Sequence, residues 1–124
     1  MFLTSMPMYS TDIEEYFGKY QSINSKHDIS FILNEEGVLN LSIDNIDIDS
    51  TSLTYDYLGI FGSTLAFQIK FNDNEKYSNI IQLFIVNIEG EIAIVTGYYM
   101  RYKTNDEYKI TIMEKQALEM TYYR

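Results

Sequence analysis

The chain has 124 residues, of which 46% are hydrophobic and 15% aromatic, and it carries a formal net charge of −9. One domain of this size can bury a sizeable core, and the hydrophobic fraction argues against disorder. The lack of cysteine excludes disulfides, thiolate nucleophiles and zinc–thiolate sites. Residues 1–100 hold 14 acidic and 4 basic side chains, which argues against direct binding to a nucleic-acid backbone.

The N-terminal segment, residues 1–17, is predicted to contain one short helix. Thr11 and Glu14 have the spacing of a capping box, and Gly18 stands where a helix would end, so the helix is expected from about Asp12 to Phe17. The first eight residues lack the basic and long apolar regions of a secretory signal, and no stretch is long enough to span a bilayer. We therefore expect a cytoplasmic protein, or a secreted one if a leader was removed.

From Gly18 onward, apolar and polar residues alternate in short stretches. The clearest is residues 64–71, in which Leu65, Phe67 and Ile69 share one face. A period of two places alternate side chains on the same side of an extended strand, so these stretches predict half-buried β-structure. Strands are expected near residues 19–23, 28–33, 38–44, 52–58, 64–71, 77–87, 91–103, 108–113 and 117–123.

Short turn-forming sequences separate the predicted strands. Connections of this length join antiparallel neighbours and cannot cross over to make parallel pairs. An open meander would leave two exposed edges, which closure into a barrel removes. The sequence therefore predicts an all-β fold with a single domain, residues 1–124. In it, an antiparallel meander over residues 18–124 closes into a small barrel of about eight to nine strands after the N-terminal helix.

A family resemblance is carried by the start of the first predicted strand, Gly18-Lys19-Tyr20, and by residues 29–39, 53–57, 62–67 and 108–120. Together they resemble the small bacterial lipocalin-like domains of the calycin group of β-barrels. Tyr20 stands where the family usually has Trp, and Arg101 is the candidate counterpart of the basic residue that packs over it. The resemblance implies a barrel that binds a small apolar or aromatic ligand in its interior, or that serves as an adaptor domain.

Inward-facing side chains of the predicted barrel are the candidates for holding such a ligand. Burial would hold its apolar surface, and tyrosine hydroxyls would fix its orientation. No cofactor is expected. The predicted ligand-binding residues are Phe31, Leu41, Tyr55, Tyr57, Phe67, Tyr99 and Arg101.

The stretch between Tyr77 and Tyr102 is apolar on both of its faces. A strand of this kind must be covered on both sides, and one side belongs to the core. The other is covered either by the N-terminal segment, through Met6, Met8, Ile13, Tyr16 and Phe17, or by a second copy or a partner protein. The latter alternative makes the chain an acidic protein-binding module or inhibitor that acts on a basic partner, such as a nucleic-acid-binding protein. The predicted interface residues are Ile80, Phe84, Val86, Ala93 and Val95.

No combination of polar residues meets the requirements of catalysis. The single histidine, His27, lies in a polar turn and is expected to be solvated. Asp44, Asp47 and Asp49 form an acidic loop without the glycine and the distal glutamate of an EF-hand, so a solvated loop is favoured over a metal site. We therefore expect a non-enzymatic protein that works by binding.

Overall fold

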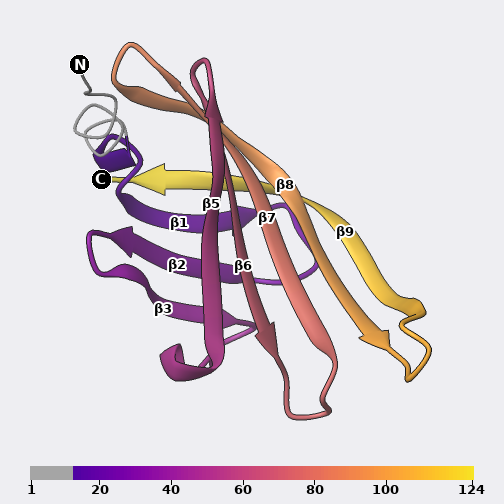
Figure 1. Cartoon of the computed structure of the whole chain (residues 1–124). Coiled ribbons are helices and arrows are strands. Elements are labelled where there is room, and N and C mark those ends of the chain that lie inside the picture. The colour runs from indigo at the N-terminus through magenta and orange to yellow at the C-terminus, as the bar shows by residue number, and fades with distance from the viewer. Residues whose placement is uncertain (1–12) are drawn as a thin grey trace.

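The computed structural model describes residues 13–124, which form one sheet of nine antiparallel strands. This confirms the predicted all-β meander, and Figure 1 shows the sheet curling into a half-barrel. The strands are β1 (Gly18–Ile23), β2 (Ile29–Asn34), β3 (Gly37–Ile43), β4 (Ile46–Asp47), β5 (Leu53–Phe61), β6 (Thr64–Asn72), β7 (Ser78–Ile88), β8 (Glu91–Thr104) and β9 (Ile110–Tyr123), and the 3-10 turn η1 (Ser50–Ser52) joins β4 to β5.

The sheet remains open between two of its strands. Its order is β4-β3-β2-β1-β9-β8-β7-β6-β5, so β1 and β9 pair as the first and last strands of a closed barrel do. Within residues 13–124, no hydrogen-bonded ladder joins β4 to β5, which are the two edge strands of the sheet. In Figure 1, β1, β2 and β3 run across β5 to β8, and β9 bends from one group to the other. Closure is therefore incomplete.

One helical turn precedes β1. The N–H of Tyr16 donates to the carbonyl oxygen of Ile13 at 2.9 Å. The predicted start of the helix at Asp12, and the predicted cover by Met6 and Met8, lie outside the described residues. In the described part of the chain, no helix is long and apolar enough to cross a membrane.

This turn is anchored to the interior of the half-barrel. Tyr16 belongs to the core, and its hydroxyl donates to the carbonyl oxygen of Ser63 at 3.2 Å. The hydroxyl of Tyr20 donates to the carbonyl oxygen of Tyr16 at 2.6 Å, and that of Tyr122 donates to the carbonyl oxygen of Phe17. The prediction that Tyr16 and Phe17 cover the outer face of the sheet is therefore wrong, because both pack against the core.

Aromatic rings fill the middle of the half-barrel. The rings of Tyr20 and Phe31 stack with centroids 5.1 Å apart, and Phe67 lies 6.2 Å from Phe31 and 5.4 Å from Tyr57. Full burial of a side chain of this size contributes about 1.5–3 kcal/mol to folding. The fully buried aliphatic residues around these rings are Ile29, Leu33, Leu41, Leu65, Ile69, Ile81, Leu83 and Ile85.

A β-bulge shifts the alternating pattern at the start of β8. Val86 of β7 pairs with Ile94, and the register then skips Ala93. The extra residue places Val95 on the core face, where it is 3% exposed, and leaves Ile94 53% exposed on the outer face. The predicted outward position of Val95 is therefore wrong, and Ile94 takes that place.

β9 is longer than predicted. Residues 108–113 and 117–123 were expected as two strands, but β9 is a single strand of 14 residues that pairs with β8.

In β8, Gly97 allows a close approach to β7, because a Cβ atom at this position would overlap the backbone carbonyl oxygen of Gln82.

Candidate ligand-binding site at the mouth of the half-barrel

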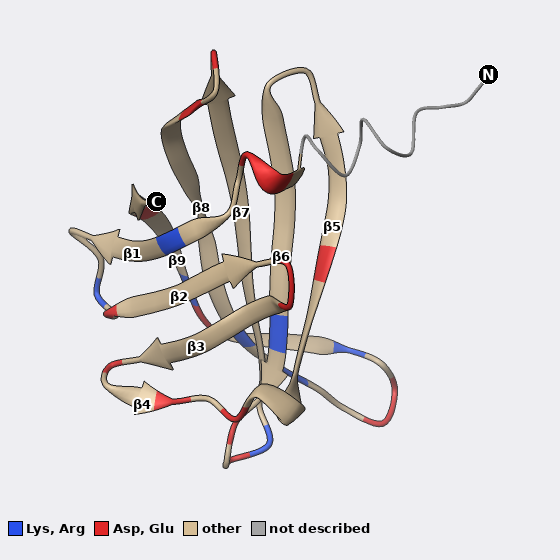
Figure 2. Cartoon of the chain, turned by 90° about the vertical axis from the view of Figure 1, so that its left-hand side faces the viewer, with Lys and Arg blue, Asp and Glu red and all other residues tan. Residues whose placement is uncertain are grey.

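A pocket of about 530 Å³ lies where β4 and η1 meet the turns after β1 and β6, and we call it the mouth pocket. Its apolar wall consists of Ile43, Ile46, Ile48 and Phe71. Figure 2 shows acidic segments in red along β4 and the neighbouring turns, at the lower end of the molecule. The charged lining comprises Asp44, Asp47, Asp49, Asp73, Glu75 and Glu114 together with His27 and Arg101.

His27 links three separate elements at one side of the mouth pocket. Its Nδ1 lies 2.6 Å from Oδ2 of Asp44 in the β3–β4 turn, and its Nε2 lies 2.7 Å from Oε2 of Glu114 in β9. The N–H of Asp28 donates to Asp44 at 2.9 Å, and Nζ of Lys26 lies 3.4 Å from Glu114. The His27 side chain is only 18% exposed, so the prediction of a solvated turn residue is wrong.

These contacts require a protonated imidazole. An ionised carboxylate can only accept, so both ring nitrogens must donate for both bonds to form. Partial burial opposes the charge, but the hydrogen bonds to Asp44 and Glu114, aided by their charges, outweigh it and raise the pKa of His27. The hydrogen bond from His27 lowers the pKa of Asp44, and it also lowers the pKa of Glu114 against the opposing effect of burial.

Arg101 forms a second ion-pair cluster across the pocket. Its Nε donates to Oδ2 of Asp73 at 2.7 Å, and its Nη2 donates to Glu75 at 3.3 Å. The guanidinium carbon lies 4.2 Å from the centre of the Tyr77 ring, within the range of a cation–π contact. Burial raises the pKa of Asp73, but the hydrogen bond from Arg101 and two further donors outweigh burial and lower it overall.

Tyr99 connects the two clusters below the surface. Its hydroxyl donates to Oδ1 of Asn79 at 2.5 Å, and Nδ2 of Asn79 donates to Asp73 at 3.1 Å. The Tyr99 ring also meets the His27 ring edge-on, with centroids 5.3 Å apart. Burial, followed by the charge of Glu114, raises the pKa of Tyr99 to about 12, so its hydroxyl remains a donor at neutral pH.

The acidic loop does not gather its carboxylates into a metal site. Asp44 is directed to His27, and Asp49 accepts from the N–H of Thr51 at 3.0 Å and so caps η1. Across residues 13–124, no group of three or more acidic, histidine or cysteine side chains is arranged to hold a metal ion. The loop contributes negative charge to the rim of the pocket.

The predicted ligand-binding residues separate into two groups. Tyr99 and Arg101 line the mouth pocket. Phe31, Leu41 and Phe67 lie in the core with at most 1% exposure, where neighbouring side chains surround them. The structure therefore brings only part of the predicted set to a pocket.

The two predicted tyrosines of β5 lie over the open side of the half-barrel. Tyr57 is half-buried on Phe67, whereas Tyr55 is 37% exposed. The Tyr55 hydroxyl lies so close to Gly37 that a Cβ atom there would overlap it. Tyr55 thus contacts the first residue of β3 through its side chain, although no ladder joins β5 to β3.

Arg101 is also not the basic residue beside Tyr20. The Tyr20 ring contacts Phe31 and Tyr122, each with ring centroids 5.1 Å apart, and the guanidinium of Arg124 lies 6.0 Å from the Tyr122 ring. Arg101 lies instead in the mouth pocket, paired with Asp73 and Glu75.

Sequence reasoning missed His27, Asp73, Asn79 and Glu114 as members of one site. His27 and Glu114 are 87 residues apart, and Asp73 and Arg101 are 28 apart, so no local spacing brings them together. For Asn79, the sequence does contain a signal: it is a polar residue at an inward position of β7, followed by three apolar residues on the same face. A polar residue on a core face needs a hydrogen-bond partner, and here that partner is Tyr99.

The predicted interface residues differ widely in exposure. Phe84 is 39% exposed, Val86 is half-buried and Ala93 is exposed, whereas Ile80 is only 8% exposed on the same sheet.

No protein-family model, characterised protein or solved structure matches the chain. The resemblance to lipocalin-like barrels therefore stays a prediction.

Proposed function

We propose that the protein is a non-enzymatic binding protein that holds a small ligand with an apolar or aromatic body and a positively charged group in the mouth pocket. The observation that carries this proposal is the lining of the pocket, in which one apolar wall faces six carboxylates and only two cationic side chains.

The size and the apolar wall favour a small molecule. A pocket of about 530 Å³ lies within the range of known small-molecule sites, which is roughly 300–1,000 Å³. Ile43, Ile48 and Phe71 offer an apolar surface, and burial of apolar ligand surface contributes about 25 cal/mol per Å² before the costs of association.

The charges favour a cation. Arg101 is engaged by Asp73 and Glu75, and His27 is engaged by Asp44 and Glu114. With both cations counted, the lining retains an excess of negative charge. An ammonium group would lower the repulsion among these carboxylates, whereas a ligand carboxylate would increase it.

The geometry of His27 supports binding rather than acid–base chemistry. A general base needs a ring nitrogen with a free lone pair, but each nitrogen of His27 faces a carboxylate. Tyr99 is likewise engaged with Asn79, and its raised pKa disfavours the phenolate.

Three aromatic probes that share one ring system test the charge preference: tryptamine, indole and indole-3-acetate. We expect tryptamine to raise the midpoint of thermal unfolding most and indole-3-acetate least, because ligand binding to the folded state stabilises it. The proposal is contradicted if none of the three raises the midpoint, or if indole-3-acetate is the most effective.

A pair of variants assigns the effect to the mouth pocket. Asp47→Asn removes a carboxylate of the lining and should weaken tryptamine binding by about two- to fivefold, the factor for one partly exposed charge pair. Asp56→Asn removes an exposed carboxylate of β5 that does not line the pocket and should leave the affinity unchanged. Equal losses in both variants would place the binding elsewhere.

A further inference from the structure

The convex face of the sheet presents a second surface that the mouth pocket does not use. Cross-strand register groups its outward side chains into three rows over β6 to β9. We define the outer face by these rows: Ala66, Phe84, Thr96 and Glu119; Gln68, Gln82, Tyr98 and Ala117; Lys70, Ile80, Met100 and Lys115.

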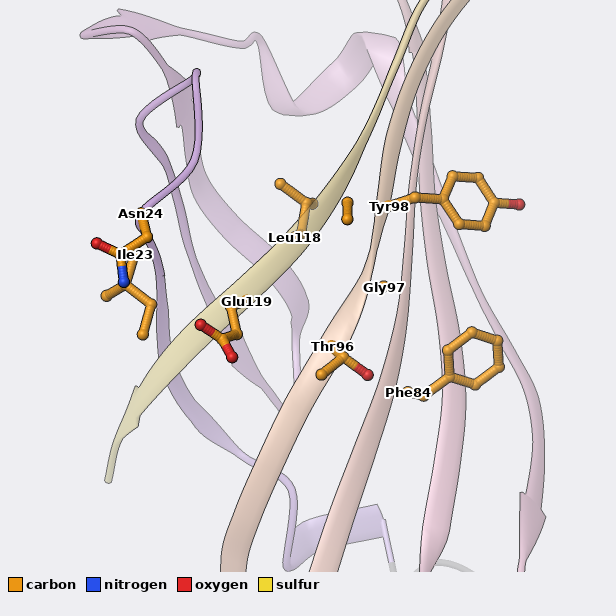
Figure 3. Close-up of a pocket in the computed structure, with 9 residues that line it drawn as sticks. Ile23, Asn24, Phe84, Thr96, Gly97, Tyr98, Leu118 and Glu119 are labelled. Atoms are coloured by element: carbon orange, nitrogen blue, oxygen red, sulfur yellow. The ribbon is translucent and has the colours of Figure 1, made fainter.

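Large apolar side chains are exposed on this face and directly beside it. Phe84 is 39% exposed, and Ile94 and Ile112, in the flanking rows, are 53% and 54% exposed. Figure 3 shows Phe84 and Tyr98 projecting to the same side of the ribbon. Next to them lies a hollow of about 560 Å³ whose lining includes Gly97 and Ala117. Exposed apolar side chains that lie side by side in this way are typical of protein interfaces.

The charge on the outer face differs from that of the whole chain. Its only charged side chains are Lys70, Lys115 and Glu119, whereas the chain carries a net charge of −9. The face therefore does not favour the basic partner that the overall charge suggests. It is instead a surface on which two copies of an acidic chain can meet without bringing their carboxylates together.

We propose that the outer face joins two copies of the chain in a symmetric dimer. The three rows are self-complementary about a twofold axis that runs across the strands along the row of Gln82, Tyr98 and Ala117. In β9, this axis places Glu119 of each copy opposite Lys115 of the other, because both residues lie two positions from Ala117. In β7, it places the exposed Phe84 opposite Ile80 of the other copy, which is 8% exposed, so Phe84 supplies most of the contact surface there.

The flanking rows match in the same arrangement. In β8, Ile94 lies two residues before Thr96 of the first row, and Tyr102 lies two residues after Met100 of the third row. The twofold axis therefore places Ile94 of one copy opposite Tyr102 of the other. Both are apolar or aromatic, and Ile112 pairs with Tyr102 within one chain. The apolar contacts thus extend beyond the three rows, and two Lys115–Glu119 pairs lie at one side of them.

The area sets the expected strength of the dimer. Four strands at about 4.8 Å spacing and five rows at about 6.6 Å spacing cover roughly 600 Å² per copy. The total of roughly 1,200 Å² lies at the lower limit for specific interfaces. We therefore expect a dimer that dissociates on dilution, not an obligate one.

Sedimentation velocity of the full chain tests the proposal. Between roughly 1 µM and 1 mM, the range in which a weak interface populates both states, we expect the mass to rise from one chain to two. Phe84→Asp should keep the protein monomeric throughout this range. The matched control Ile46→Asp, which changes a 65% exposed residue of β4, should dimerise like the wild type. A wild type that stays monomeric, as it would if the face serves a different protein, overturns the proposal, and so does a Phe84→Asp variant that still dimerises.

Charge reversal at Lys115 and Glu119 tests the twofold arrangement and leaves every apolar side chain of the outer face in place. Within one chain, Nζ of Lys115 also lies 5.0 Å from the centre of the Tyr98 ring. Lys115→Glu and Glu119→Lys should each weaken the dimer by about two- to fivefold, because each places like charges opposite one another. The double variant, Lys115→Glu with Glu119→Lys, should regain most of the wild-type affinity. Both side chains are exposed, so folding should be preserved. A double variant that is no stronger than the single variants contradicts the proposed axis.

Discussion

The middle of the half-barrel and its mouth are built by the same strands but hold opposite kinds of side chain. In β7, the inward positions change from Asn79 at the mouth to Ile81 and Leu83 in the middle, and in β8 they change from Arg101 and Tyr99 to Val95. The middle is filled by packed rings, and the mouth is held by ion pairs around a pocket. The same strand thus contributes to the packed core and, a few residues away, to the candidate site.

The largest expected effect on stability follows from disrupting the packed aromatic rings in the middle of the half-barrel. Phe67→Ala removes a ring that is 0% exposed and contacts Phe31 and Tyr57. We expect a loss of about 3–5 kcal/mol in the free energy of unfolding, measured by urea denaturation, because the substitution leaves a cavity. Phe61→Ala, at a 68% exposed position, should cost less than about 1 kcal/mol. Similar losses in both variants would contradict a packed interior.

A smaller effect is expected from breaking the buried network at the mouth. Asn79→Ala leaves the hydroxyl of Tyr99 without its acceptor, and an unpaired buried polar group costs about 1–3 kcal/mol. The double variant, Asn79→Ala with Tyr99→Phe, removes both partners, so it should lose less than the sum of the two single variants. Strictly additive losses in a denaturation cycle would show that the two residues do not stabilise one another.

The smallest of these effects depends on pH. The pKa of His27 is raised in the folded state, so its contacts stabilise the fold fully below the unfolded-state value of 6.5 and are lost as the pH rises through the folded-state value. The groups that contact the ring are Asp44, Glu114 and Tyr99, and Lys26 pairs with Glu114 beside it. Relative to His27→Gln, the wild type should lose stability on the order of 1 kcal/mol as the pH rises above this window. An identical pH dependence in the two proteins would contradict the double contact of His27.

The alternating pattern was sufficient for the strands and for much of the core. It placed Leu65, Phe67 and Ile69 on one buried face, as the structure confirms. It misplaced Val95, because a single extra residue at Ala93 changes which face every later residue occupies. The pattern carries no information on where a bulge occurs, so the composition of the outer face could be read only from the register.

The mouth pocket was less predictable than the fold. His27 and Glu114 look like solvated polar residues in the sequence, and their pairing depends on how the β1–β2 turn meets β9 in space. Whether the interior is hollow also depends on packing, which residue types alone do not determine. The ligand was expected among Phe31, Leu41 and Phe67, whereas the structure fills that space with their own rings and side chains.

The most direct test is to map tryptamine binding on the folded protein by the chemical shifts of its backbone amides. A binding site at the mouth predicts that the largest changes occur at Ile43, Ile48, Asp73 and Tyr99, with little change at Phe31 and Leu41. Changes centred on Phe31 and Leu41, or on Phe84 of the outer face, would contradict a ligand site at the mouth of the half-barrel.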